Sequence, residues 1–429
     1  MKKFPRIACY GFIEKGAGSL SGSHFLVLEE MLKRGYEVDC YGWSGFNEPY
    51  NLKIYSNYRF IHLPSHSIDF KNWKFLPSFL ADKVSLAFNL FWVLPQNGLS
   101  LRKSVIHQHI VRNYDYFIVM GLASPCKKIP DLKTISWLQG HPTTEWIYLY
   151  KLRKIISNLC GQSLYWKLRF FYLLKNTRYR KEIQESDILI CGSQWSKDHL
   201  IKSGVRDSTV TVIPYPIDLS FFSSLTGEVP TCQERTTFLW LGRIDPRKRL
   251  DLLMAAYEGV VEELSSEIPD LKLRVIGRIP YAQGYQALID NFKYPDSIEY
   301  LMNIDRKDIP NLFRHTDCLV QPSEGENFGT SVGEALASGV PVILGPSNGT
   351  QDFTGLSAFK FSEYTADSLR KTMVSAIREI RKNREPIYRE CIVTAEKNFD
   401  VKKVVDDIEE VSKISPYLNN QLFMSVSNF

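Results

Sequence analysis

The sequence has no uncharged apolar run longer than the 11 residues from Val84 to Leu94. A helix that crosses a bilayer needs about 20 such residues, so we expect no membrane-spanning helix. The start of the chain, MKKFPRIACYGF, is basic, but Gly11, Glu14 and Lys15 interrupt its apolar stretch before the core of a signal peptide could form. We therefore expect a cytoplasmic protein that is not secreted.

The sequence also has no CxxC pair and no cysteines at metal-ligand spacing, although it contains eight cysteines. Cys9, Cys191 and Cys318 lie in apolar runs typical of buried strands, which favours reduced thiols over disulfides. The segment His107-Gln108-His109 could suggest a metal site. Two ligands without a nearby third more often form a polar patch, so we expect no metal.

A strong excess of charge of one sign is missing as well. The 53 basic and 47 acidic residues leave a net charge of +6, which suits phosphate-bearing ligands or an anionic membrane but does not indicate a nucleic-acid binder. Hydrophobic residues make up 44% and charged residues 23%, as in ordinary soluble globular proteins. At about 150 residues per domain, the 429 residues predict two or three domains.

The first half of the chain alternates strands and helices. Residues 7–12, 22–34 and 36–41 predict a strand–helix–strand unit, because the apolar residues of the middle segment recur on one helical face. The following segment is aromatic and less regular, and its helices are placed only loosely. Further strands are expected at residues 116–120, 134–138, 187–191 and 210–213, with a helix at 194–202.

The second half repeats the alternation after Pro214, Pro216 and a polar linker through Pro230. Such alternation predicts a parallel sheet covered on both faces, which binds ligands beyond the carboxyl ends of its strands. The expected strands are residues 238–241, 271–276, 298–301, 318–321 and 340–344, and the expected helices are 250–263, 307–315 and 329–337.

A basic segment, LGRIDPRKRL, follows the first strand of this second half. Arg243 and Lys248 would emerge at the ligand-binding edge of the sheet, where two fixed cations suit a diphosphate. A solvated basic turn is the alternative for this segment alone.

A second segment, QPSEGENFGTSVGEALASG, runs from a strand through a loop into a helix near Phe328 or Gly329. Amides at a helix start favour an anion, and Gly329 has no Cβ to hold a ligand away. Glu326 and Glu334 can accept hydrogen bonds from hydroxyls. Alternatively, Glu326 is a helix N-terminal acid and Glu334 a surface acid. Together with the basic segment, these residues indicate a nucleotide-sugar site.

The spacing Glu326-x7-Glu334, with LGRIDPRKRLDLL upstream, resembles the family-4 retaining glycosyltransferases of GT-B fold. So do SDILICGSQWSKDHL, VTVIPYPIDLSFF and IEYLMNIDRKDIPNLFRHTDCLVQPS. The resemblance is close over residues 185–352 and loose before them. It implies two Rossmann-like, doubly wound parallel-sheet domains facing each other across a cleft. They are an acceptor-binding domain (1–214) and a nucleotide-sugar-binding domain (215–400), followed by a helical tail (401–429) packing on the first domain.

The resemblance also implies roles for individual residues. Arg243 and Lys248 would neutralise the donor diphosphate, Glu326 would hold the donor sugar and Glu334 the ribose, while His141 matches the sugar-site histidine. We count Arg243, Lys248, Glu326 and His141 as catalytic. The other expected donor contacts are Gly16, Gly18, Gly242, Arg278, Met302, Asn327, Phe328, Gly329 and Thr330. Independently of the resemblance, we expect base recognition near Gly277-Arg278 and Leu301-Met302-Asn303, where strand ends approach the cleft.

Two positions depart from the family pattern. Tyr215-Pro216 stands where Asn-Gly is frequent, and Asp352 stands where glutamate is common, which leaves the donor-sugar contacts open.

We therefore expect a retaining hexosyltransferase that needs no metal or other cofactor. It would move a sugar from a nucleotide diphosphate sugar to a glycan or a lipid-linked acceptor, in cell-surface polysaccharide or glycolipid synthesis. A nucleotide-sugar hydrolase or epimerase, or an inactive binding subunit, are the alternatives. The spacing Gly16-x-Gly18 with Asp39 downstream hints at a nicotinamide cofactor, but Gly22 is one position too late for that motif.

Residues 151–181 contain nine lysines or arginines and no acid, interleaved with aromatic and aliphatic residues. This composition suits a helix lying on anionic lipid at the inner face of the cytoplasmic membrane, and residues 70–94 could cooperate. A core helix with a solvated basic face is the alternative.

Overall fold

The computed structural model describes residues 5–11, 13–15, 20–43, 49–63, 110, 113–121, 132–140, 142–223, 235–279 and 283–414. The glycine loop with Gly16 and Gly18, His141, the 107–109 segment and residues 70–94 lie outside this part, as does the chain beyond residue 414. Among the helices of the described residues, none is long and apolar enough to cross a membrane.

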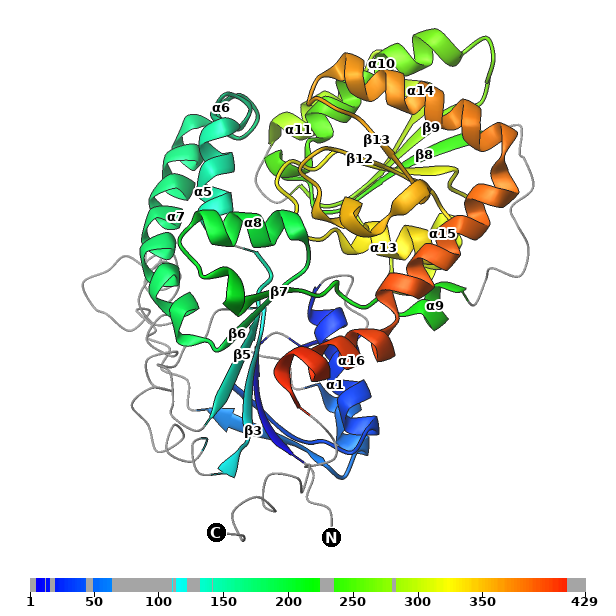
Figure 1. Cartoon of the computed structure of the whole chain (residues 1–429). Coiled ribbons are helices and arrows are strands. Elements are labelled where there is room, and N and C mark those ends of the chain that lie inside the picture. The colour runs from blue at the N-terminus through cyan, green and yellow to red at the C-terminus, as the bar shows by residue number, and fades with distance from the viewer. Residues whose placement is uncertain are drawn as a thin grey trace, which may run out of the picture.

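The first sheet has seven parallel strands in the order β3-β2-β1-β4-β5-β6-β7 (Figure 1). Ala8 and Cys9 of its inner strand β1 face opposite sides of the sheet and are both fully buried, as expected when both faces are covered. The strands are β1 (Arg6–Gly11), β2 (Glu37–Trp43), β3 (Tyr58–Leu63), β4 (Tyr116–Met120), β5 (Lys133–Trp137), β6 (Ile188–Cys191) and β7 (Val210–Val212). Helices α1 (Leu20–Lys33) and α8 (Gln194–Lys202) belong to this half.

The second sheet has six parallel strands in the order β10-β9-β8-β11-β12-β13. Alternate residues of β8 face opposite sides: Phe238 and Trp240 join one apolar core, and Leu239 joins the other. The strands are β8 (Thr236–Leu241), β9 (Leu271–Ile276), β10 (Ile298–Leu301), β11 (Cys318–Gln321), β12 (Val342–Leu344) and β13 (Ala358–Lys360). The helices are α9 (Leu219–Ser223), α10 (Leu250–Leu264), α11 (Gln283–Asp290), α12 (Ile309–Arg314), α13 (Thr330–Ala337), α14 (Ala366–Lys382), α15 (Arg384–Phe399) and α16 (Val401–Ser412).

The two parallel sheets confirm the expected α/β class, with small differences in individual elements. The helix expected at 307–315 is a 3-10 turn (Arg306–Asp308) followed by α12, and the strand expected from residue 340 begins at Val342 because Pro341 precedes it. Strands β3 and β13 were not expected; β13 is a three-residue edge strand that leaves little pattern in the sequence.

The chain crosses between the sheets twice, and the two crossings lie side by side. Ile217, on the way from β7 to β8, donates its backbone N–H to the carbonyl of Phe399 at 3.0 Å. Helix α16 then packs beside α1, where the Arg34 guanidinium lies 2.6 Å from Asp406 and Tyr36 donates to Glu409 at 2.9 Å. The boundary at 214/215 stays a prediction; β7 ends at Val212 and β8 begins at Thr236.

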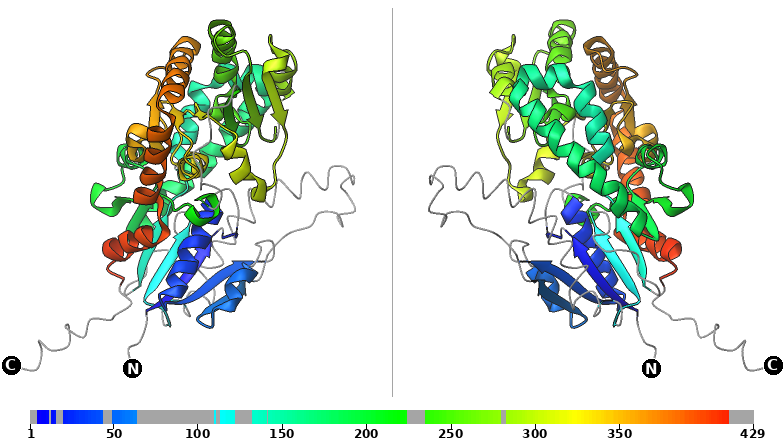
Figure 2. Two further views of the ribbon diagram at one scale, coloured as in Figure 1. Left: turned by 90° about the vertical axis from the view of Figure 1, so that its right-hand side faces the viewer. Right: turned by 90° about the vertical axis from the view of Figure 1, so that its left-hand side faces the viewer.

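Three helices form a hairpin that stands beside both sheets (Figures 1 and 2). They are α5 (Pro142–Lys151), α6 (Arg153–Cys160) and α7 (Gln162–Glu182). The hairpin has a small core of its own, made of Leu149, Leu152, Ile156 and Tyr165. We refer to α5–α7 as the hairpin below.

Candidate functional site

The loop after β8 presents Arg243 at the carboxyl edge of the second sheet. Asp245, which is 4% exposed, accepts a hydrogen bond from the Arg247 amide at 3.1 Å and holds Nη2 of Arg243 at 3.2 Å. The Arg243 side chain itself is 66% exposed. Its charge is therefore oriented by a buried carboxylate and remains accessible to a ligand.

Lys248 lies at the end of the same loop and contacts Glu326. Nζ of Lys248 is paired with Oε2 of Glu326, and both side chains are largely buried. The turn at 347–349 fixes Glu326 in turn: its N–H donates to Ser347 at 3.0 Å and its carbonyl accepts from Gly349 at 2.8 Å. The structure thus brings together a cation and a carboxylate that the sequence separates by 78 positions.

Beneath this pair lies a buried charge cluster centred on Glu324. Its carboxylate contacts Nη1 of Arg249 at 2.5 Å and Nζ of Lys151 from the hairpin. Arg249 also pairs with Asp251 at 3.2 Å and lies over the ring of Tyr364. Burial works against the charge of Arg249, yet Asp251 and Glu324 raise the pKa of its guanidinium above the ordinary value.

Arg249 has a left-handed backbone, with φ of 51°. That conformation costs an arginine roughly 1–3 kcal/mol, so it persists only where surrounding contacts impose it. Here the ion pairs to Asp251 and Glu324 do so, and the position of the loop that carries Lys248 depends on them.

Helix α5 closes over the 324–326 loop from the other domain. Nη1 of Arg247 lies 2.8 Å from Glu145 of α5 and donates to the Gly325 carbonyl at 3.1 Å. Gly325 has φ of +81°, and a Cβ there would lie 2.4 Å from the ring of Tyr148. The loop can pass under α5 only with glycine at this position.

Gly329 is the N-cap of α13, and its amide is already used within the protein. It donates to Oγ1 of Thr350 at 2.9 Å, while its carbonyl accepts from Val332 and Gly333. The helix start leaves the amides of Thr330 and Ser331 without an acceptor inside the helix. Of the amides expected to contact a donor, that of Thr330 is therefore better placed than that of Gly329.

Asn327 connects this loop to the end of β5. Its Nδ2 donates to the Gln139 carbonyl at 2.9 Å and to the Tyr215 hydroxyl at 3.3 Å. Tyr215, at the departure from the family pattern, is fully buried and stacks on Trp137 with ring centroids 5.2 Å apart. The segment that leads directly to position 141 thus lies against the 326–329 loop. Phe328 is 4% exposed, and its ring packs against Tyr215 as part of the core.

Glu334, the second glutamate of the spaced pair, is buried on the inner side of α13. Burial raises the pKa of its carboxyl, opposed by Arg306, whose Nη1 lies 2.7 Å away. Arg306 was not foreseen from the sequence. On the neighbouring strand ends, Arg278 is exposed and Met302 is 63% exposed.

Asp352, the other departure, caps α8 of the first half. Its Oδ2 accepts from the Gln194 amide at 2.8 Å, and burial raises the pKa of the carboxyl against this hydrogen bond. In this structure Asp352 therefore joins the two halves of the chain.

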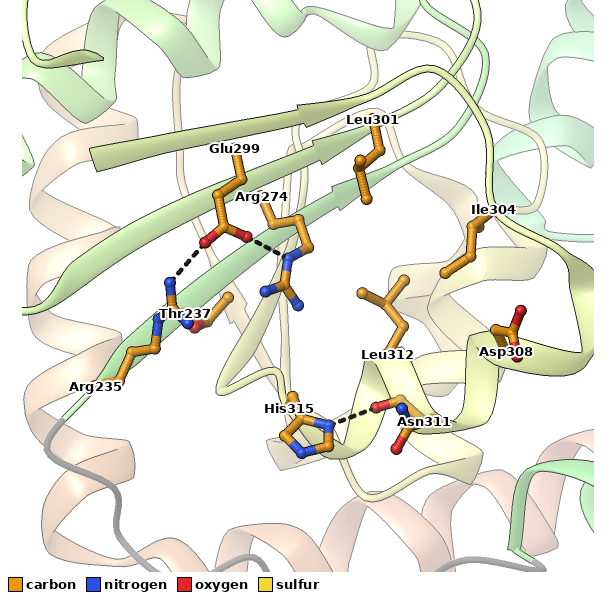
Figure 3. Close-up of a pocket in the computed structure, with 10 residues that line it drawn as sticks. All are labelled: Arg235, Thr237, Arg274, Glu299, Leu301, Ile304, Asp308, Asn311, Leu312 and His315. Atoms are coloured by element: carbon orange, nitrogen blue, oxygen red, sulfur yellow. Dashed lines mark hydrogen bonds and ion pairs between the residues drawn. The ribbon is translucent and has the colours of Figure 1, made fainter. Parts of the chain in front are cut away.

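A cavity of about 380 Å³ lies between β8–β10 and α12 (Figure 3). Arg235 and Arg274 both point into it, and both pair with Glu299, at 2.6 and 2.8 Å. The Glu299 carboxylate balances one of their two positive charges, and Asp270 lies 3.7 Å from Arg235. Leu301, one of the residues near which we expect base recognition, is part of the lining, which contains none of the other expected donor contacts.

Sequence reasoning missed the partners of the expected residues, namely Lys151, Arg247, Arg249 and Glu324. A signal was present: Arg247-Lys248-Arg249 and Glu324-Gly325-Glu326 hold more charges than one diphosphate needs. The excess charges pair with each other and hold the loops. No structural observation tests Gly16, Gly18 or His141, which lie outside the described residues.

Comparison with known proteins finds similarity mainly in the second half of the chain. Residues 228–392 match the family model described as glycosyl transferases group 1. The uncharacterized glycosyltransferase YqgM of Bacillus subtilis (strain 168) is 30% identical over 171 residues, which are 40% of this chain and 45% of that protein. A GDP-mannose-dependent alpha-(1-6)-phosphatidylinositol monomannoside mannosyltransferase of Mycolicibacterium smegmatis is 22% identical, over 47% of this chain and 54% of the relative. The chain thus matches about half the length of these relatives.

Solved structures show the same fold over nearly the whole chain. Anabaena Alr3699/HepE in complex with UDP and glucose has a TM-score of 0.58 at 16% identity, covering 95% of this chain and 99% of that one. The structure described as "Trehalose-6-phosphate from E. coli bound with UDP-2-fluoro glucose" has a TM-score of 0.64 at 14% identity, covering 96% and 99%. Residues 228–392 are therefore similar to the glycosyl transferases group 1, and the chain as a whole has the GT-B fold.

Proposed function

We propose that the protein is a retaining hexosyltransferase of family 4 that uses a nucleotide diphosphate sugar as donor. The observation that carries the proposal is the meeting of Lys248 with Glu326 beside the accessible Arg243, at the carboxyl edge of the second sheet. A cation pair beside a carboxylate suits a diphosphate joined to a sugar. The family match of residues 228–392 supports the same activity.

The chemistry follows from the charges that develop during transfer. Cleavage of the bond between sugar and phosphate leaves positive charge on the sugar and negative charge on the departing diphosphate. Arg243 and Lys248 stabilise the diphosphate, and groups held in place before the reaction typically contribute about 10²–10³ in rate each. The acceptor hydroxyl attacks from the same face, and the leaving phosphate takes its proton, so the anomeric configuration is retained.

Glu326 and Glu334 differ in their proposed roles. Glu326 is released from Lys248 when a diphosphate competes for the cation, and its carboxylate then accepts hydrogen bonds from the donor sugar. Glu334 is paired with Arg306. When a donor binds, the Glu334 carboxylate keeps this pair and also accepts a hydrogen bond from the ribose. His141 completes the sugar site, and the amide of Thr330 contributes to the phosphate site. Gly16, Gly18 and Gly242 let the donor approach the backbone.

The partners are proposed from chemistry and from related proteins. The two neighbouring structures described above contain UDP or a UDP sugar, and one relative is named for GDP-mannose, so we propose a nucleoside diphosphate sugar as the donor class. A structural neighbour, WaaG, is described as involved in lipopolysaccharide biosynthesis. We propose a glycan or lipid-linked acceptor, a role in polysaccharide or glycolipid synthesis, and a cytoplasmic location at the inner face of the membrane.

The experiment has two stages. UDP, GDP and ADP are first compared for thermal stabilisation, because a ligand at 100 times its dissociation constant adds about 2.7 kcal/mol to stability. The sugar derivatives of the best base are then incubated with and without glycan and lipid acceptors. We expect transfer that requires an acceptor, lowered about 10²–10³-fold by Lys248→Ala.

The matched control is Lys371→Ala, which removes an exposed lysine of α14 and should leave the rate unchanged. Equal release of sugar without any acceptor would point to a hydrolase. Donor binding without turnover would point to an inactive subunit. Normal transfer by Lys248→Ala would remove the proposed role of that lysine.

A further inference from the structure

The hairpin presents a cluster of exposed apolar side chains. In the part of the chain that the structure describes, eleven large apolar side chains are exposed, and five of them belong to the hairpin. The other six are scattered over both halves of the fold. The five, which we call the apolar patch, are Ile147 (44% exposed), Tyr150 (56%), Trp166 (61%), Phe170 (60%) and Leu173 (46%).

The patch is continuous across two helices. Trp166, Phe170 and Leu173 recur at positions i, i+4 and i+7, on one face of α7. Arg169 of the same helix lies over the rings of Trp146 (4.8 Å) and Tyr150 (5.9 Å) of α5. This arginine joins the aromatic side chains of α5 and α7 into one surface.

The charge around the patch is of one sign. Arg153, Lys154 and Lys167 are exposed on α6 and α7, and residues 151–181 contain no acid. The one acid of α5, Glu145, is paired with Arg247. Aromatic rings flanked by exposed cations match the boundary between lipid headgroups and acyl chains, where ring and cation are each favourable.

We propose that this face of the hairpin docks on an anionic lipid membrane. A second copy of the chain is a poorer occupant, since a two-fold contact would place the basic patch of one copy against the same cations of the other. The inner side of α5 contacts the 324–326 loop, so docking would hold the candidate donor site close to the lipid surface. The docking surface deepens the proposed function by naming the membrane that carries the acceptor.

Vesicle sedimentation of the full chain tests the proposal. We expect binding to phosphatidylcholine vesicles that contain phosphatidylglycerol, and little binding to phosphatidylcholine alone. The double substitution Trp166→Ser with Phe170→Ser should weaken binding about tenfold or more, because each ring loses an interfacial contact. Arg153→Gln with Lys154→Gln should weaken it about fivefold per cation and reduce its dependence on salt.

The control is Ile54→Ser with Leu356→Ser, which removes side chains that are 79% and 87% exposed on other parts of the surface. It should bind vesicles as the wild type does. Equal binding by the patch variant and the wild type would overturn the proposal. So would a concentration-dependent dimer, seen by light scattering, that the patch variant abolishes.

Thermal stabilisation by nucleoside diphosphates, measured without lipid, separates this proposal from the proposed function. The patch variant should keep the wild-type shift. If the wild type is stabilised by nucleotide but does not bind vesicles, the docking surface alone is refuted. If the wild type binds vesicles but is not stabilised by any nucleotide, the donor site alone is refuted.

Discussion

The two ends of the candidate donor site are built differently. At one end, Arg249 pairs with Glu324 in a buried contact, and Lys248 pairs with Glu326 in a largely buried one. At the other end, where strand ends are expected to meet the base, Met302 is 63% exposed. The contrast indicates that the phosphate and sugar end is organised before the donor arrives, which is what stabilisation of developing charge requires. The base end is left to adapt to its ligand.

Removal of the central carboxylate should have the largest effect on the paired end. Glu324→Ala leaves Arg249 with Asp251 alone and Lys151 without its carboxylate, and breaking such a buried pair costs about 3–5 kcal/mol. Urea unfolding followed by circular dichroism measures the loss. The matched control is Glu385→Ala, from an exposed pair with Arg389, which should change stability by less than about 1 kcal/mol. Similar losses of stability in the two variants would contradict the view that the Glu324 ion pairs hold this end of the site in place.

One arginine from each end gives a direct comparison in catalysis. Arg243→Ala should lower kcat about 10²–10³-fold, because in the proposed function its charge stabilises the leaving diphosphate. Arg278→Ala should change KM for the donor only a few-fold and leave kcat alone, because an exposed contact with the base binds substrate and transition state equally. Steady-state kinetics on both variants tests this. An equal loss of kcat in the two variants would show that the phosphate end and the base end do not differ in their contribution to catalysis.

The buried Glu334 predicts a pH dependence of stability. Burial raises the pKa of its carboxyl above the ordinary value of 4.5, so its contribution to stability is complete below that pH and is lost as pH rises through the folded-state value. The wild type should therefore lose stability relative to Glu334→Gln as the pH rises above 4.5. Thermal unfolding of both proteins across this range measures the difference, and a constant difference would show that Arg306 fully offsets burial.

The smallest effect is expected at the open end. Met302→Ser should leave the stability within about 0.5 kcal/mol of the wild type, as for most exposed positions. It should weaken the best nucleoside diphosphate by less than about tenfold. Titration calorimetry with that nucleotide provides the affinity. If Met302→Ser weakened nucleotide affinity as much as Lys248→Ala does, the base end would also be fixed before the donor binds.

Much of the second half could be predicted from the sequence, because its signals are local. Apolar runs that end at Gly242 and Gln321 placed β8 and β11, and Arg243, Lys248 and Glu326 followed from where those strands end. The pairing of charges could not be predicted, because it depends on tertiary distance. Lys151 belongs to a basic segment that suits a solvated or membrane-facing helix, yet it contacts Glu324, 173 positions away along the chain.

The helices of the first half were harder to predict from the sequence, because their apolar residues are compatible with either a buried or an exposed face. The face of α7 with Trp166 and Phe170 is apolar but exposed, so its pattern alone did not decide between a core helix and a surface helix. Tyr215, fully buried beside Trp137, gave no local sign of its contact with Asn327.

The backbone hydrogen bond between Ile217 and Phe399 has a mechanical consequence. Because the two connecting segments are joined where they pass from one half to the other, they define a single hinge axis between the halves. Rotation about that axis displaces the far side most, and the far side is where Glu145 meets Arg247 and Lys151 meets Glu324. These two ion pairs, together with the contacts of Asn327 and Asp352, would therefore resist an opening of the two halves.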